Sequence, residues 1–295
     1  MKITIFDLSK HFNVTVIGDN VELDGINLVD RQSIKKSILS YVTSIKYIDS
    51  VNNNISIKCL ALNSDMYEYY KSKLNRKLTF LITDNPESFF YSSYEFLLKN
   101  NFVSIIEFSK KIGENTIISP TAIIEDSVII GNNCTIGDYS IISKNTIIGN
   151  DVYIGRGVKI GSQGFQIVKS LSGPQTIYHI GGVKIGNNVY IGDNSVVSRN
   201  LFEGYNTIGD NVKIDSLCSI SHNCEIGNNS ILAAGVQMCG SSIIKENCWI
   251  GTNSTILNKV VIGANALIGI GSVVVKNIEE NKVVYGVAAS VKRDI

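Results

Sequence analysis

The 295-residue sequence has few histidines and prolines and almost no net charge. A formal charge of +1 provides no large basic field, so nucleic-acid binding through phosphate neutralisation is not expected. Three prolines and 25 glycines exclude a collagen-like or linker-like chain. No apolar run reaches the roughly 20 residues of a membrane span, and the N-terminus lacks the apolar stretch of a secretory signal. The 44% of hydrophobic residues can instead build a sizeable core.

The cysteines and histidines lack the spacing of a metal site. The six cysteines include no Cys-x-x-Cys pair and have no paired histidines beside them. Only His179 and His222 lie beyond the first 108 residues, too few for a three-histidine zinc site in one chain. We therefore expect no metal, and reduced structural thiols in a cytoplasmic protein.

Most of the chain follows a six-residue repeat. An aliphatic residue falls at every sixth position in three runs, 112–160, 185–197 and 208–274, often followed by glycine. Period six fits neither an α-helix nor simple strand alternation, but it fits a coil of three short sides with one inward aliphatic on each. The 24 hexads predict about eight stacked coils of eighteen residues. This is the signature of hexapeptide-repeat proteins, whose fold is a left-handed parallel β-helix.

Two segments interrupt the repeat. Residues 161–182 contain Gly173-Pro174, which predicts a loop, and residues 198–207 contain Leu201, Phe202 and Tyr205. A solenoid that extrudes a loop commonly uses that face for binding, although a neutral insertion is the alternative.

The first 108 residues have a different composition, with 15 of the 23 Phe and Tyr residues. Strands are predicted at 14–17, 55–60 and 79–82, and helices at 66–74 and 86–99, the second with Asn85 as N-cap. No Gly-x-Gly-x-x-Gly follows the first strand, so a dinucleotide-binding fold is not expected. We predict a small α/β domain at 1–108, a left-handed β-helix at 109–278 and a short tail at 279–295.

His222 is the candidate base. It stands two residues after the inward Ile220, so its side chain should lie away from the dry column, and Asp215 follows the preceding inward residue. A carboxylate near an imidazole can orient it, and a neutral imidazole is a suitable base for an amine or hydroxyl nucleophile. Because no Ser or Cys nucleophile motif accompanies the pair, direct transfer to a deprotonated acceptor is favoured. A plain surface histidine is the alternative.

Several segments together resemble one family. They are Gly161-Ser162-Gln163-Gly164-Phe165, His179-Ile180-Gly181-Gly182, Ile214-Asp215, Ile220-Ser221-His222-Asn223, Ala233-Ala234-Gly235-Val236 and Gly240-Ser241. They resemble the UDP-3-O-(3-hydroxyacyl)glucosamine N-acyltransferases of lipid A synthesis, a step of lipopolysaccharide biosynthesis. The resemblance implies that His222 is the general base, that Asp215 is its acidic partner, and that the Gly240 N–H stabilises the oxyanion. It also implies a cytoplasmic homotrimer with active sites between neighbouring solenoids.

The N-terminal domain carries its own part of the resemblance. Residues 39–47 are similar to the family segment in which two aromatics six apart hold the uracil ring, and Tyr41 and Tyr47 match them. Two core tyrosines are the alternative. Lys46, Asn223, Phe165 and His179 complete the expected substrate-binding set. The family's second functional histidine aligns with Lys259, and the Asn and Pro of its nucleotide loop are Ser44 and Ile45.

The chain stops at Ile295, so the family's C-terminal helical extension, which engages acyl carrier protein, is expected to be missing. A short acyl group from coenzyme A is then an alternative donor. The sequence predicts an N-acyltransferase that uses acyl-CoA or acyl carrier protein as co-substrate, with no permanently bound cofactor. Its acceptor would be a UDP- or dTDP-linked amino sugar. The alternatives are the lipid A enzyme itself, an O-acyltransferase, and a non-catalytic nucleotide-binding solenoid.

Overall fold

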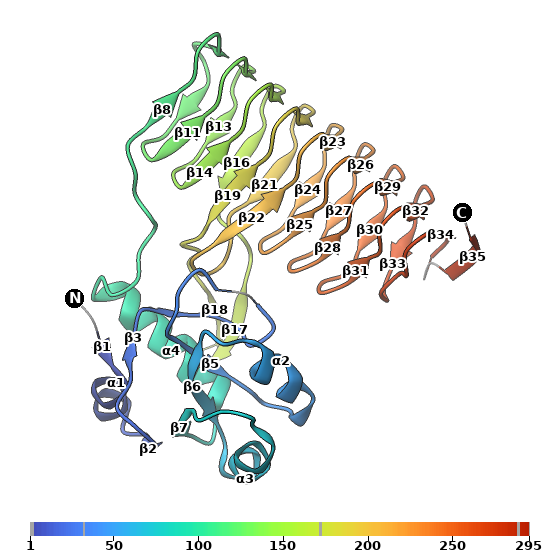
Figure 1. The fold of residues 1–295 in the computed structure, drawn as a ribbon. Helices are drawn as coiled ribbons and strands as arrows, with labels where there is room; N and C mark the ends of the chain where they lie inside the picture. The colour runs from blue at the N-terminus through green and yellow to red at the C-terminus, as the bar shows by residue number, and fades with distance from the viewer. Residues whose placement is uncertain (1–2, 32, 171–172, 288–289, 295) are drawn as a thin grey trace. The chain divides into compact units, whose positions relative to one another are not determined.

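The computed structural model describes residues 3–31, 33–170, 173–287 and 290–294 (Figure 1). These residues form two compact units. The N-terminal unit comprises residues up to Ser104 together with Gln166–Ile177 and Phe202–Gly204, and the solenoid unit comprises Ile105–Phe165, Tyr178–Leu201 and Tyr205 onward. The predicted boundary at residue 108 therefore omits two short segments that lie inside the repeats in sequence.

The N-terminal unit is a small α/β fold. Its five-stranded sheet has the order β2-β7-β6-β5-β4, in which only the β2–β7 pair is antiparallel. The strands are β2 (Thr15–Ile17), β4 (Gly25–Ile26), β5 (Ile38–Tyr41), β6 (Ile57–Leu62) and β7 (Thr79–Ile82), and β1 (Ile3–Thr4) pairs with β3 (Glu22–Leu23). The helices are α1 (Ile5–Phe12), η1 (Ile45–Tyr47), α2 (Ile48–Asn53), α3 (Ser64–Lys73) and α4 (Pro86–Lys99).

Helix α4 begins where the sequence predicts it. The Asn85 side chain accepts a hydrogen bond from the Ser88 N–H at 3.0 Å, and Pro86 occupies the first turn, where a missing N–H is tolerated. Phe90 and Tyr94 of this helix pack edge to face on Phe202, with ring centroids 5.6 and 5.0 Å apart. Phe202 of the second interruption therefore belongs to the core of the N-terminal unit, whereas Tyr205 belongs to the solenoid unit.

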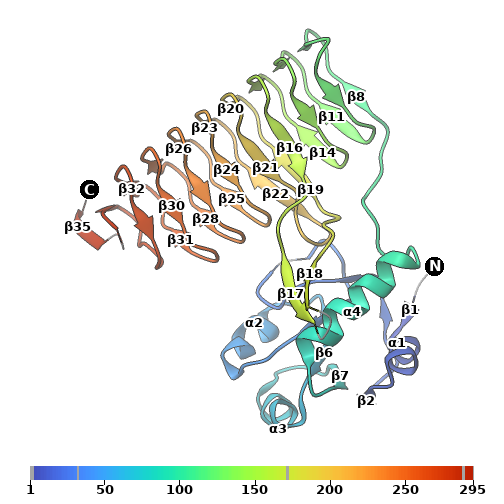
Figure 2. The same ribbon diagram turned by 180° about the vertical axis from the view of Figure 1, so that it is seen from behind.

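The first interruption is partly structured. Strands β17 (Ile167–Ser170) and β18 (Gly173–Thr176) pair antiparallel, and β17 lies against α4 (Figure 2). The predicted loop is thus a β-hairpin, and residues 171–172 between its strands lie outside the described part of the chain.

The solenoid unit has three faces of parallel strands, and successive strands pass from face 1 to face 2 to face 3 (Figure 1). Face 1 contains β8 (Lys111–Ile112), β11 (Val128–Ile130), β14 (Thr146–Ile148), β19 (Gly182–Ile185), β22 (Tyr205–Ile208), β25 (Glu225–Ile226), β28 (Ile243–Ile244) and β31 (Val261–Ile262). Face 2 contains β9 (Ile117–Ile118), β12 (Thr135–Ile136), β15 (Tyr153–Ile154), β20 (Tyr190–Ile191), β23 (Lys213–Ile214), β26 (Ile231–Leu232), β29 (Trp249–Ile250) and β32 (Leu267–Ile268). Face 3 contains β10 (Ile123–Ile124), β13 (Ile141–Ile142), β16 (Lys159–Ser162), β21 (Val196–Ser198), β24 (Ser219–Ile220), β27 (Gln237–Met238), β30 (Thr255–Ile256) and β33 (Val273–Val274).

The repeat positions pair with one another from coil to coil. Ile130 lies beside Ile148, and across the first interruption Ile148 lies beside Ile185. The inward aliphatics from Ile130 onward are almost fully buried and form one continuous core. The predicted column of inward residues is thus confirmed, except in the first coil, where Ile112 is 42% exposed because no coil stacks beyond it.

Asparagines line the corner between faces 1 and 2. Here the side-chain amide of one coil donates to the side-chain oxygen of the next, as in the 2.7 Å bond from Asn188 to Asn211. The ladder continues to Asn229, Asn247, Asn265 and Asn281. These residues have φ between 53° and 60°, a left-handed backbone that asparagine tolerates better than most residues. The corner thus uses the residue type that both turns the chain and links the coils.

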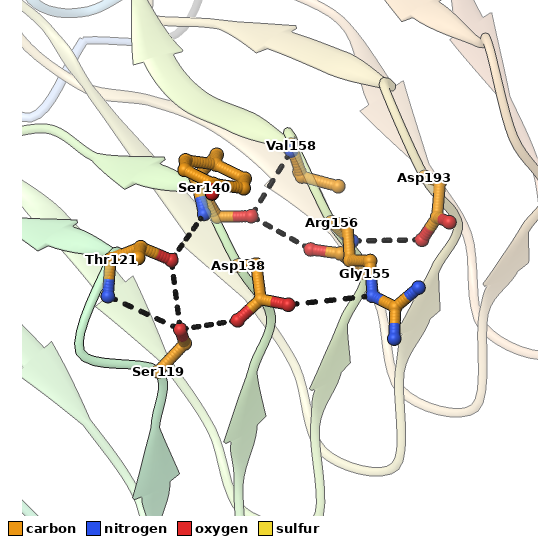
Figure 3. A network of polar contacts seen from close by, with 9 residues as sticks. Ser119, Thr121, Asp138, Ser140, Gly155, Arg156, Val158 and Asp193 are labelled. Carbon is orange, nitrogen blue, oxygen red and sulfur yellow. Dashed lines mark hydrogen bonds and ion pairs between the residues drawn. The ribbon is translucent and has the colours of Figure 1, made fainter.

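The corner between faces 2 and 3 carries a polar network in its early coils (Figure 3). Ser119 Oγ donates to Asp138 Oδ1 at 2.5 Å, and Arg156 Nε lies 3.6 Å from Asp138 Oδ2. The Arg156 N–H donates to Asp193 Oδ1 at 2.8 Å. Each side chain belongs to a different coil, so the network joins four coils at one corner.

Residues after 278 are not a separate tail. Strand β34 (Lys282–Tyr285) pairs parallel with β32, and β35 (Ser290–Asp294) pairs antiparallel with β34. Val284 is fully buried beside Ile268. Face 2 therefore extends beyond the last predicted hexad.

Candidate active site

Both interruptions leave the solenoid at the corner between faces 3 and 1, which we call the 3–1 corner. The first follows β16 and the second follows β21, and both strands lie on face 3. His222 follows β24 and Gly240 follows β27, the next two strands of that face (Figure 1). Of the predicted catalytic residues, His222 and Gly240 thus lie at this one corner.

The hydrogen bond at His222 Nδ1 sets the tautomer of the imidazole. Nδ1 lies 2.9 Å from Asn223 Oδ1. The same oxygen accepts the backbone N–H of Leu201 at 3.1 Å, which identifies it as an acceptor. His222 Nδ1 therefore carries the proton and donates to Asn223, and Nε2 keeps its lone pair in the neutral ring. A general base accepts the proton through such a lone pair.

Gly240 lies directly against that nitrogen. A Cβ placed on Gly240 would be 2.7 Å from His222 Nε2, too close for any side chain at this position. The N–H groups of Cys239 and Ser241 donate to Ile256 O and His222 O in the adjacent coils. Between them, the N–H of Gly240 has no acceptor in the described part of the chain. The geometry therefore leaves a backbone donor beside the candidate base.

His179 and Gly164 pack around His222. The His179 ring is fully buried and meets the His222 ring edge to face, with centroids 5.1 Å apart. The Gln163 amide fixes the His179 backbone, since its oxygen accepts the His179 N–H at 3.0 Å and its nitrogen donates to the His179 carbonyl at 3.2 Å. A Cβ on Gly164 would be 2.4 Å from His179 Nε2, so a glycine is required for this packing.

Asn206 joins the two turns of the corner. It is fully buried, and its amide nitrogen donates to Ser198 O at 2.7 Å and to Ser221 O at 2.8 Å. Asn223, predicted to bind substrate, is 93% buried and adopts a φ of 60°. Its side-chain oxygen accepts hydrogen bonds from His222 Nδ1 and from the Leu201 N–H, so in this structure Asn223 positions the base.

Asp215 lies at a different corner from His222. It follows β23 of face 2, whereas His222 follows β24 of face 3, and its carboxylate accepts the Ser216 N–H at 2.7 Å. The expected proximity of the two side chains within one chain is therefore not observed. Asn223, rather than Asp215, supplies the hydrogen bond at His222 Nδ1.

The two predicted nucleotide-binding tyrosines lie in the N-terminal unit. Tyr41 ends β5, packs on Phe90 with centroids 4.8 Å apart, and donates its hydroxyl to Glu87 at 3.2 Å. Burial raises the pKa of Tyr41, and the nearby Tyr91 and Glu87 raise it further. Lys46 Nζ sits 5.0 Å from the centre of the Tyr47 ring.

Phe165 is 80% exposed and directly follows Gly164. An aromatic ring in water beside a packed histidine pair is a suitable contact for an apolar ligand. Sequence reasoning missed Gln163, Arg199 and Asn206 as parts of the corner. Their partners are backbone carbonyls and amides between 8 and 38 residues away, which no local motif reveals.

The comparisons with known proteins agree with the repeat. The model for bacterial transferase hexapeptide repeats (six repeats) matches residues 109–144, 207–240 and 241–276. A UDP-3-O-acylglucosamine N-acyltransferase of Campylobacter lari is 35% identical over 136 residues, which are 46% of this chain and 42% of the relative. The Caulobacter enzyme of the same name is 34% identical over 122 residues, 41% of this chain and 36% of the relative. The chain thus aligns with about two fifths of the length of these relatives.

A solved structure shows the same fold. The UDP-N-acetylglucosamine acyltransferase of Campylobacter jejuni is 25% identical with a TM-score of 0.57, over 65% of this chain and 73% of that one. None of the helices in the described residues is long and apolar enough to cross a membrane. The chain is therefore a left-handed β-helix of hexapeptide repeats with a small α/β unit, similar over part of its length to the UDP-3-O-acylglucosamine N-acyltransferases.

Proposed function

We propose that this protein is an N-acyltransferase that moves an acyl group from a thioester to the amino group of a nucleotide-linked amino sugar. The observation that carries the proposal is the pairing of His222 Nε2 with the peptide group of Gly240 at one corner. A base and an N–H donor on adjacent coils are what acyl transfer requires. The resemblance of the chain to curated N-acyltransferases supports the same reaction.

In the proposed reaction, His222 Nε2 takes a proton from the acceptor amine as its nitrogen attacks the thioester carbonyl carbon. The Gly240 N–H donates to the oxygen on which negative charge develops. The carbon–sulfur bond then breaks, the amide forms, and the imidazolium returns the proton to the leaving thiolate. Asn223 keeps the ring in the reactive tautomer throughout.

Tyr41 and Tyr47 would hold the pyrimidine, with Lys46 beside them, and Phe165 and His179 would contact substrate near the base. An orienting role for Asp215 remains a prediction, as does a homotrimer in which it could meet His222 of a neighbour. The donor would be acyl-CoA or acyl carrier protein. We propose a cytoplasmic location because all six cysteines are free thiols, as expected in a reducing compartment.

The test is a matrix of donors and acceptors. Purified protein is incubated with acetyl-CoA or a long-chain hydroxyacyl carrier protein, against UDP- and dTDP-linked amino sugars, and products are identified by mass spectrometry. The names of the curated relatives favour a UDP-3-O-acylglucosamine acceptor, which would make this the lipid A enzyme. Consumption of dTDP-amino sugars alone would assign it to glycan synthesis, and nucleotide binding without thioester consumption would contradict catalysis.

The role of His222 is tested by replacing it with alanine. If it is the base, His222→Ala should lower kcat by about 10²–10⁴. His11→Ala is the matched control, because His11 is exposed and lies in the N-terminal unit. Near-normal turnover of the His222 variant would exclude it as the base.

A further inference from the structure

Arg199 occupies the position equivalent to His222 in the preceding coil. Val197 of β21 pairs in register with Ile220 of β24, and Arg199 and His222 each come two residues after the paired residue of their strand. Parallel strands lie about 4.8 Å apart, so the two Cα atoms are close neighbours at the 3–1 corner. The Arg199 side chain is therefore attached to the backbone next to the residue that carries the candidate base.

The charge of Arg199 is buried without a close counterion. The residue is only 5% exposed, and its Nε donates to Gly161 O at 2.7 Å. Within the described residues, its terminal amino groups have no hydrogen-bond acceptor and no carboxylate at ion-pair distance. Burial lowers the pKa of Arg199, and the electrostatic effects of Tyr178 and Glu125 oppose this change. A largely buried cation without a carboxylate partner is costly. The Arg199 terminal amino groups are not among the fully buried atoms that lack a partner, so an anion that arrives with a ligand can reach them.

We propose that Arg199 binds a phosphate of the nucleotide-linked acceptor. This inference rests on the proposed function. The planar guanidinium fork of arginine matches phosphate oxygens in a bidentate manner, and Nε is already used to fix its direction. In a nucleotide-linked glucosamine, the amino carbon is bonded to the carbon that carries the diphosphate. An acceptor whose amine meets His222 Nε2 therefore brings its phosphate close to that residue.

The donor also contains phosphate, but in an unsuitable place. The phosphate of phosphopantetheine is separated from the thioester by the whole pantetheine arm. A donor whose carbonyl lies at Gly240 would carry its phosphate well away from the base. The position of Arg199 therefore favours the acceptor.

The test compares Arg199→Gln and Arg199→Lys with the wild type. Loss of charge-assisted bonds should raise the KM of the nucleotide amino sugar about 10- to 100-fold in Arg199→Gln. The KM of the donor should stay within about twofold. Arg199→Lys should recover part of the loss, since it keeps the charge without the fork. The control is Arg156→Gln, which removes an exposed arginine at the equivalent position of another corner.

Binding measured by calorimetry separates the possible outcomes without relying on turnover. Wild-type protein should bind UDP more tightly than uridine, and Arg199→Gln should remove most of that difference. A rise in donor KM alone would overturn the proposal and assign Arg199 to the donor phosphate. Equal losses for both substrates, together with a lower Tm, would show that Arg199 only anchors the turn at Gly161. Acyl transfer with unchanged acceptor KM would refute this inference alone, whereas absence of both UDP binding and acyl transfer would refute the proposed function too.

Discussion

Replacing Glu203 with glutamine should stabilise the N-terminal unit at alkaline pH. Glu203 is 3% exposed, and its Oε2 has no hydrogen-bond partner among the described residues. It faces Gly25 and Lys35 inside the unit. Burial raises its pKa from 4.5 to about 7, against the opposing effect of Lys35 and with a small addition from Asp24.

The sign and size of the effect follow from this pKa. The pKa of Glu203 is higher in the folded state than in the unfolded state. Below pH 4.5 the carboxyl is protonated in both states and does not destabilise the fold, and between pH 4.5 and 7 it lowers the free energy of unfolding progressively. One pKa unit corresponds to about 1.4 kcal/mol, so the ionised carboxylate costs the fold about 3 kcal/mol at pH 8. At pH 5 the cost is below about 1 kcal/mol. Glutamine keeps the shape and removes the charge at every pH.

Urea unfolding followed by circular dichroism at 222 nm is a suitable assay, because the described helices all lie in the N-terminal unit. Glu203→Gln should gain about 3 kcal/mol at pH 8 and little at pH 5. The control is Glu107→Gln, which replaces an exposed glutamate. A gain of equal size at both pH values, or a loss at pH 8, would refute the reasoning.

Three further changes test the solenoid. Gly240→Ala would place a Cβ 2.7 Å from His222 Nε2 and so displace the base. This should lower kcat about 100-fold with little change in Tm. A normal kcat would contradict the assignment of His222 and Gly240 to the active site. Gly182→Ala would bring a Cβ within 2.0 Å of the backbone oxygen of Asn145 and should destabilise the solenoid by about 1–3 kcal/mol. Urea unfolding followed by the fluorescence of the single tryptophan measures this loss, and unchanged stability would contradict the packing. Cys239 is the only one of the six cysteines that is not buried, so iodoacetamide should label it first in the native protein. Mass spectrometry of the peptides measures the labelling, and faster labelling of another cysteine would refute the prediction.

The six-residue repeat predicts both the coils and which residues share a corner. Where no interruption intervenes, equivalent corner positions are separated by eighteen residues, as His222 and Gly240 are, whereas Asp215 and His222 are seven apart. Seven residues are about one six-residue side, so Asp215 and His222 lie at successive corners, which is why the Asp215 pairing is not seen within one chain. The true partner, Asn223, is adjacent in sequence and was assigned to substrate instead.

The interruptions were harder to predict because tertiary contacts decide their structure. Gly173 and Pro174 indicate a loop, yet both lie in β18, opposite β17. Phe202 is fully buried against aromatic rings of α4, a contact about a hundred residues away in sequence. Neither local propensity nor period can reveal such a partner.

The eighteen-residue coil also limits how such a chain can change in length. Removing or adding a whole coil would keep every remaining residue on its face, and the asparagine ladder would close again with the same partners. An insertion of any other length, unless it is extruded at a corner, would move all later residues out of their positions on the three faces. Duplication of coils away from His222 should therefore lengthen the protein without altering its chemistry, whereas a one-residue insertion inside a strand would turn inward aliphatics towards water.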